Sequence, residues 1–285
     1  MLITNGQAKL VSHPVRSSDG DAFWAGGSGA STVDGRPGLP GALVWSETGA
    51  SATDFATAVF EITPVPVTGR PPRLFALLDT RELRVGTRVE LVGGIGDNPT
   101  SVIAQTTLKR LPNGKVGTWL YLPTQSNLFA YWGWRIYNDD GDGAYLLPGS
   151  TVYVGEVFAD AVESWPAASM KIDLVDPTSV NRSAGNQPWP TMRRPYRKAD
   201  VTVTAQHFDR AFIDQTGNLQ ALQYALATAH YFAIVPRERE RGSASASDDY
   251  VQRMAMLVRC TSLGDLSADA SRDAYSLQLS LEELL

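Results

Sequence analysis

The amino-acid sequence predicts a mostly β protein with an N-terminal arm, a β-sandwich domain and a smaller β-rich domain carrying one or two short helices. Three observations lead to this prediction. The turn formers, 25 glycines and 17 prolines in 285 residues, are spread along the chain. Between them lie short runs rich in β-branched and aromatic residues, a pattern typical of sandwiches and barrels. A single good stretch shows the spacing of an amphipathic helix.

Residues 1–50 form the predicted arm. Their sequence is small and polar at 26–31 and rich in glycine and proline at 35–41, so it offers little material for a core of its own. Apolar anchors are nevertheless present at 23–24 and 43–45. Two alternatives therefore stay open, an arm that is mobile and an arm that lies against a neighbour.

Residues 51–164 are expected to form the sandwich, of a jelly-roll or galactose-binding-like kind. At 88–91, polar and apolar residues alternate strictly, as a half-exposed antiparallel strand requires. Tight-turn sequences follow at 112–114 and 140–143, where Asn, Asp and Gly tolerate positive φ. The expected strands lie at 59–62, 73–78, 87–92, 118–122, 131–137 and 151–158.

Residues 165–285 are expected to form a smaller, β-barrel-like domain. The helical spacing runs through 206–231, and Asn218 is placed to cap a second short helix after a break. A polar segment at 237–249 is predicted to be a hairpin loop or an insertion. The expected strands of this domain lie at 171–175, 196–204, 232–236, 254–261 and 274–281.

Composition argues against several classes of partner. The 25 basic and 30 acidic residues give a net charge of −5, so no general affinity for nucleic acid is expected. No run approaches about 18 apolar residues, and the N-terminus lacks a basic region followed by an apolar stretch. We therefore expect neither a membrane span nor a secretory signal. The single cysteine, Cys260, cannot form an internal disulfide or a cysteine-based zinc site.

The residues that carry most enzyme chemistry are sparse. Three histidines, His13, His207 and His230, are too far apart in sequence for a helical metal motif. A glycoside hydrolase needs two carboxyl groups at a fixed separation across a cleft. The carboxylates at 139–142 and Glu156 are not expected to form such a pair across a cleft, because most of them lie in one turn. We expect no enzyme activity and no cofactor.

An acidic turn contains the strongest candidate for a metal site. Asp139, Asp140 and Asp142 place three carboxylates within four residues, and carboxylate oxygens are ligands for calcium. The helices and the final glutamate of an EF-hand are missing, so a surface hairpin turn is the competing interpretation.

Two further groups are candidates for binding. On the strand expected at 131–137, Tyr131, Arg135 and Tyr137 share one face, which predicts a glycan platform or a subunit interface. The opposite face of that strand, with its tryptophans, is expected to lie in the core. Basic residues also gather near the start of the strand at 196–204, where a contact with an acidic neighbouring subunit is expected. They include Arg193, Arg194 and Arg197.

Three phrases give the chain a resemblance to a known group of proteins. The first is the aromatic strand at 131–136 followed by the run at 152–158. The second is the segment 175–187, in which an Arg-Ser pair precedes Gly-Asn-Gln. The third runs from the strand lead-in at 194–204 to the final strand. Together they resemble tail-tip or distal tail (baseplate) proteins of long-tailed bacteriophages and prophages, with Asn186 in the place of a glycine.

The resemblance implies a structural subunit of the virion tail tip, assembled in the cytoplasm of the bacterial host. Such a subunit would form a homo-oligomeric ring, six-fold or three-fold, between the tail tube and the tail hub. The resemblance brings no catalytic residue with it. The alternative function is a carbohydrate-binding module that contacts host cell-surface glycans.

Overall fold

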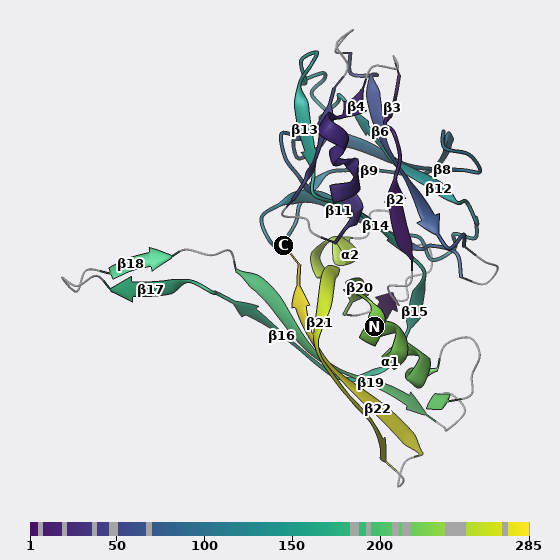
Figure 1. Ribbon diagram of the computed structural model, residues 1–285, viewed down its shortest axis with the longest axis vertical. Helices are drawn as coiled ribbons and strands as arrows, with labels where there is room; N and C mark the ends of the chain where they lie inside the picture. The colour runs from purple at the N-terminus through teal and green to yellow at the C-terminus, as the bar shows by residue number, and fades with distance from the viewer. Residues whose placement is uncertain are drawn as a thin grey trace.

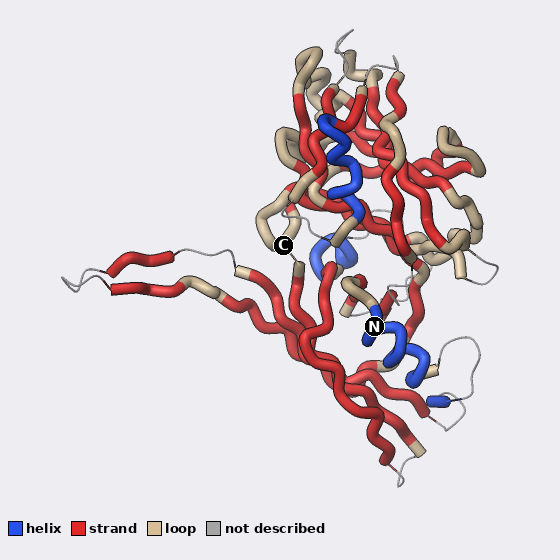
Figure 2. Tube along the Cα trace, in the orientation of Figure 1, coloured by secondary structure: helices blue, strands red, loops and turns tan. Residues whose placement is uncertain are grey.

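Figure 1 shows the computed structural model of the chain. It describes residues 1–4, 8–18, 22–35, 39–45, 51–66, 70–182, 188–191, 195–206, 211–212, 218–236, 249–269 and 273–284. The fold is mostly β, as predicted, and strands dominate the trace in Figure 2. A sandwich lies at the top of the view, a long twisted sheet lies below it, and a narrow ribbon projects from that sheet.

One layer of the sandwich is a six-stranded antiparallel sheet in the order β2-β6-β12-β8-β9, with β3 also paired to β6. The opposite layer is a four-stranded sheet in the order β10-β11-β7-β14. The strands of the first layer are β2 (Lys9–Ser12), β3 (Arg16–Ser17), β6 (Phe55–Thr63), β8 (Arg88–Gly94), β9 (Ser101–Thr107) and β12 (Tyr131–Tyr137). Those of the second are β7 (Leu74–Thr80), β10 (Lys109–Arg110), β11 (Val116–Tyr121) and β14 (Glu156–Asp160).

The core between these layers explains why the two sheets stack. The rings of Phe75 on β7 and Trp132 on β12 approach to 4.8 Å between centroids, across the two sheets. The indole Nε1 of Trp134 donates to the carbonyl of Ala76 at 3.1 Å, so its one polar atom is satisfied inside the core. Both tryptophans and Phe75 are fully buried. The predicted β-sandwich is therefore confirmed.

The described residues of 1–50 form strands and a 3-10 helix that pair with or pack on the rest of the molecule, where an irregular arm was expected. Its first strand, β1 (Leu2–Thr4), pairs with the lower sheet. Its next strands, β2 and β3, extend the six-stranded layer beside β6. The remaining elements, which pack against the sandwich core, are β4 (Phe23–Trp24), the 3-10 helix η1 (Ala25–Val33), β5 (Gly41–Val44) and its partner β13 (Thr151–Val154).

The lower domain is an open sheet where a barrel-like domain was expected. Its seven strands follow the order β15-β1-β20-β21-β22-β19-β16, and within the described residues the end strands β15 and β16 do not pair with each other. Two strands also come from outside the predicted bounds of 165–285. Besides β1, the sheet contains β15 (Val162–Ser164), β16 (Ala167–Val175), β19 (Tyr196–Gln206), β20 (Phe232–Val235), β21 (Met256–Asp269) and β22 (Ala274–Glu283).

Helix α1 (Leu219–Thr228) covers one face of this sheet. Leu222 and Leu226 are buried in the same cluster as Val201 and Phe232 of the strands. The helix begins where the sequence predicts, because the Asn218 side chain accepts a hydrogen bond from the backbone N–H of Ala221 at 2.7 Å. Gln206, expected at the start of the helical stretch, instead ends β19. The rest of 206–217, apart from residues 211–212, lies outside the described residues.

A second helix, α2 (Asp249–Met254), joins the lower domain to the sandwich. The amide of Gln252 accepts from the backbone N–H of Trp119 on β11 at 2.9 Å and donates to the carbonyl of the same residue. It also donates to the hydroxyl of Thr118 at 2.9 Å. The Gln252 side chain thus pairs with both backbone polar groups of Trp119, as a neighbouring strand would. Gln252 is only 4% exposed, so these hydrogen bonds lie in the interior. A shared apolar cluster, with Leu2 and Phe158 among its members, lies at the same junction.

Candidate functional site

The aromatic strand β12 has the two faces that the sequence predicts. Trp132, Trp134 and Ile136 are fully buried in the sandwich core. Arg135 and Tyr137 lie on the opposite, outward face of the six-stranded sheet, where cross-strand neighbours decide their surroundings.

A single carboxylate organises this outward face. Glu90 on β8 is 2% exposed, and its oxygens receive Arg88 at 2.8 Å and Arg135 at 3.1 Å. The hydroxyl of Tyr137 donates to the same carboxylate at 2.9 Å, and the amide of Gln105 donates at 2.6 Å. Two Arg charges and two neutral donors thus satisfy one buried acid, as a buried charge requires.

The pKa values of the cluster follow from this geometry. Burial by itself raises the pKa of Glu90, but the hydrogen bonds from Arg88 and Tyr137 and the neighbouring guanidinium charges outweigh it, so the pKa is lowered. Burial raises the pKa of Tyr137, with the neighbouring carboxylate adding to the rise. The hydrogen bond to Glu90 raises the pKa of Arg88. Glu90 is thus a permanent anion near neutral pH.

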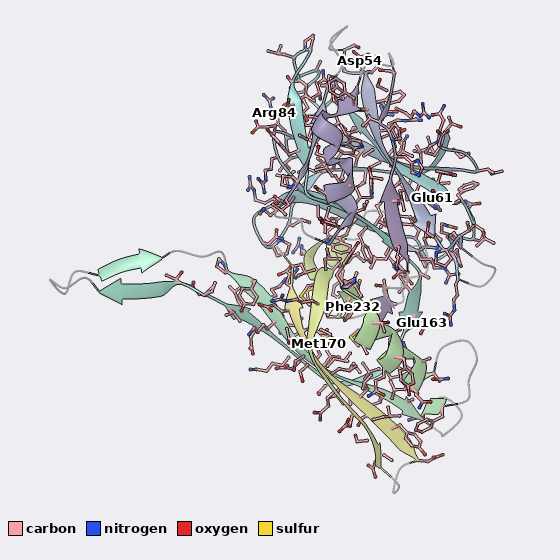
Figure 3. The ribbon with its side chains drawn as sticks, viewed as in Figure 1. Asp54, Glu61, Arg84, Glu163, Met170 and Phe232 are labelled. Carbon is pink, nitrogen blue, oxygen red and sulfur yellow. The ribbon has the colours of Figure 1, made fainter. Side chains whose placement is uncertain are left out.

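The expected glycan platform is largely occupied by the chain itself. Arg135 stacks on Phe55 at 4.5 Å and Arg88 stacks on Tyr137 at 4.1 Å, which leaves the Tyr137 ring 8% exposed. Tyr131, at the other end of the strand, is half-buried and meets His13 edge-on at 5.2 Å. That histidine also contacts the carboxylate of Glu61 at 3.0 Å, at the right of the sandwich in Figure 3.

The acidic turn does not bring its carboxylates together around one point. The side chain of Asp139 accepts from the backbone of Gly141 at 2.9 Å, and that of Asp140 accepts from the backbone of Asp142 at 3.1 Å. Asp140 also pairs with Arg84 at 2.9 Å, and this hydrogen bond lowers the pKa of the Asp140 carboxyl. Within the described residues, no group of three His, Cys, Asp or Glu side chains is placed to hold a metal ion. Calcium binding by this turn therefore stays a prediction. The competing hairpin is not formed, because the turn joins β12 to β13, and these two strands belong to different sheets.

The basic cluster is divided by the structure. Arg193 and Arg194 lie outside the described residues. Arg197 begins the core-facing side of β19, where its guanidinium pairs with the carboxylate of Glu283 and donates to the carbonyls of Arg253 and Ala255. Its side chain is 14% exposed. Arg197 thus joins β19, β22 and the end of α2 within one chain, and its contact with another subunit stays a prediction.

A feature that the sequence did not predict is the projecting ribbon. Beyond the core, β16 and β19 lead into a separate hairpin of β17 (Ser179–Arg182) and β18 (Pro188–Thr191), which pair only with each other within the described residues. Figure 1 shows this hairpin far from both cores. Along β16, Met170 and Ile172 pack against the lower core, whereas Leu174, next on the same face, is 73% exposed. The apolar face therefore continues past the end of the core that it serves.

Comparisons with known proteins name no family for this chain. No model of a known protein family matches the sequence. No curated protein matches it. Among solved structures, the chain is similar to the K1 cleaved adhesin domain of Lys-gingipain from Porphyromonas gingivalis W83, with 12% identity over 56% of this chain and 97% of that chain, at a TM-score of 0.30. In the described parts of this chain, no helix is long and apolar enough to cross a membrane.

Proposed function

We propose that the protein is a structural subunit of the tail tip, or baseplate, of a long-tailed bacteriophage or prophage. Copies of the chain assemble into a three-fold or six-fold ring, which joins the tail tube to the host-recognition hub. The subunit belongs to the virion and assembles in the cytoplasm of the bacterial host. The observation that carries the proposal is the ribbon formed by β16, β17, β18 and the start of β19.

The ribbon has the features of a segment that completes its contacts on another molecule. A two-stranded hairpin by itself is only marginally stable in water, because it has no face to bury. Strand β16 is also an edge strand, whose outer backbone groups have no strand partner within the described residues. Exposed strand edges are liabilities in a monomer and become contacts in a closed assembly. The exposed Leu174 adds an apolar side chain at the root of this ribbon.

The position of the ribbon agrees with the resemblance to tail proteins. The segment 175–187, one of the three stretches behind that resemblance, includes β17 of the ribbon. A sequence segment that a structural subunit has in common with the tail proteins it resembles is expected at a contact between subunits. The glycan-binding alternative has no comparable support, because Arg135 and Tyr137 are engaged by Glu90.

Sedimentation velocity on matched variants tests the proposal. Leu174 and Leu147 are each 73% exposed, but Leu174 lies on β16 and Leu147 in a loop of the sandwich. A charge within a subunit interface is costly to bury, so Leu174→Asp should shift the protein from oligomer toward monomer. Leu147→Asp should leave the oligomer intact. The proposal would be overturned if both variants behaved alike. It would also be overturned if the wild-type chain were monomeric at about 100 μM, a concentration at which even a complex with a micromolar dissociation constant would form.

A further inference from the structure

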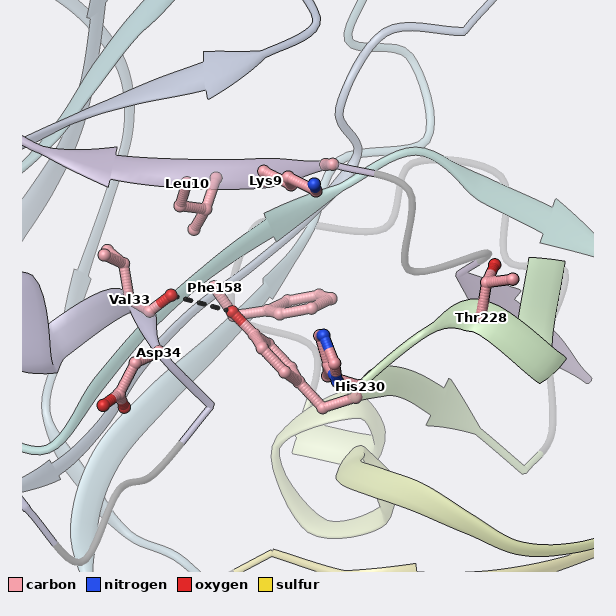
Figure 4. A pocket seen from close by; sticks show the side chains of 9 residues that line it. Lys9, Leu10, Val33, Asp34, Phe158, Thr228 and His230 are labelled. Carbon is pink, nitrogen blue, oxygen red and sulfur yellow. Dashed lines mark hydrogen bonds between the residues drawn. The ribbon is translucent and has the colours of Figure 1, made fainter.

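A pocket lies at the junction of the two domains, away from the ribbon and from the Glu90 cluster. Its volume is about 600 Å³, within the range of small-molecule sites. Four described parts of the chain line it: the start of strand β2, the end of η1, strand β14, and the end of α1 with the residues that follow it. Figure 4 shows these parts facing one another around the gap.

Aromatic rings form the inner wall of the pocket. Phe158 on β14 is 3% exposed, and its ring lies 6.2 Å from that of Tyr231. The hydroxyl of Tyr231 donates to the carbonyl of Val33 at 3.1 Å, which fixes the ring against the end of η1. Gly35 lies so close to this ring that a Cβ at that position would come within 2.3 Å of a ring carbon, so a side chain would not fit there. The wall is therefore preformed and apolar, with its polar atom already satisfied.

The mouth of the pocket carries two basic groups. Lys9 on β2 and His230 after α1 are both exposed, and neither side chain makes a hydrogen bond or an ion pair with any residue that the structure describes. In Figure 4 both side chains lie on the Phe158 side of the pocket. The carboxylate of Asp34 points away from them, on the other side of Val33. The side of the pocket next to Phe158 thus combines an aromatic ring with an ammonium and an imidazole that have no partner among the described residues.

We propose that this junction pocket binds a small organic acid, with its carboxylate between Lys9 and His230 and a ring or comparable apolar body against Phe158. A carboxylate accepts charge-assisted hydrogen bonds from an ammonium and accepts from an imidazole N–H. The aromatic wall supplies the apolar contact that a ring-bearing ligand needs. This inference concerns a different surface from the ribbon and does not depend on the proposed ring.

Titration of the full-length protein, followed by ligand-detected nuclear magnetic resonance, tests the pocket. The probes are benzoate, with both a ring and a charge, benzyl alcohol, with the ring alone, and acetate, with the charge alone. Benzoate should bind at least five-fold more tightly than either of the other two. Equal binding of benzoate and benzyl alcohol would show an apolar cavity only and would overturn the proposal, as would no benzoate binding up to 50 mM, a concentration far above a millimolar dissociation constant.

Variants assign the carboxylate contact. Lys9→Gln and His230→Gln change exposed side chains and should each weaken benzoate binding three-fold or more, with the unfolding midpoint unchanged. Lys171→Gln is the control, because it removes the same charge from an exposed site on β16. An equal loss in Lys171→Gln would mean general charge attraction and would contradict the site. Unchanged binding in both pocket variants would contradict it as well.

Discussion

The junction between the sandwich and the lower sheet depends on Gln252, and removal of its amide should be costly. Gln252→Leu keeps a side chain of similar size but leaves the N–H and the carbonyl of Trp119 without their partner. Each buried backbone group left unsatisfied costs about 1–3 kcal/mol, so the variant should lose about 2–6 kcal/mol of unfolding free energy. The Thr118 hydroxyl loses the donor that the Gln252 amide supplies, and we count nothing for this loss.

Urea unfolding followed by tryptophan fluorescence measures this loss, because Trp119 lies at the altered contact. The matched control is Gln223→Leu on α1. That amide makes one hydrogen bond, to the carbonyl of Gly264 at 3.0 Å, and it is half-buried. The control should cost about 1 kcal/mol or less. The reasoning about the junction is refuted if Gln252→Leu lies within about 0.5 kcal/mol of wild type, the spread of ordinary surface substitutions.

Three further predictions concern the outward face, the helix and the acidic turn. Glu90→Gln should destabilise the protein by about 3 kcal/mol at pH 7, because it leaves two guanidinium groups without their anion. The control Glu82→Gln changes an exposed side chain and should have little effect on stability. Since the pKa of Glu90 is lowered in the fold, its stabilisation is present at neutral pH and is lost as the pH falls through that pKa, so urea titrations should show the two chains converging in acid. Asn218→Ala removes the cap of α1 and should cost about 1 kcal/mol in the same assay. Addition of calcium or of a chelator should leave the thermal midpoint unchanged, because the side chains of 139–142 bond to Arg84 and to the turn backbone, and a rise of several degrees with calcium would contradict this.

The parts of the fold that the sequence predicts are those with a strong local signal. The two faces of β12 follow from the alternation of tryptophans with tyrosine and arginine, and the structure confirms the buried face. The start of α1 follows from Asn218, because a side-chain cap acts on the next few residues. In both cases the residues that decide the structure lie within one turn or one strand of each other.

The parts that the sequence missed depend on distant partners. Strand β1 is three residues long, and it becomes a strand only because β15 and β20 lie on either side of it. The open lower sheet could not be foreseen for the same reason, since one of its inner strands comes from the predicted arm. Helix α2 is six residues long and has little helical periodicity to detect.

The candidate binding residues show the same limit. The sequence places Arg135 and Tyr137 on an outward face but cannot reveal that Glu90, from another strand, occupies both. The pocket of Lys9, Phe158 and His230 draws on segments that lie 149 and 72 residues apart in sequence, so no local motif marks it. The ribbon exists because β16 and β19 extend past the core on which they pack. The alternation of polar and apolar residues does not show where that core ends.

The number of subunits in the assembled particle tests the central claim most directly. Native mass spectrometry should find three or six copies for the full chain. In a chain without the outer part of the ribbon, the β17–β18 hairpin, residues 176–195 are replaced by Asn-Gly. Val175 and Tyr196 already face each other in the β16–β19 register, so a two-residue turn can join them. We expect this variant to be a folded monomer that keeps the strands of both cores and loses only β17 and β18. A full chain found only as a monomer, or a ring that persists without the ribbon, would contradict the account.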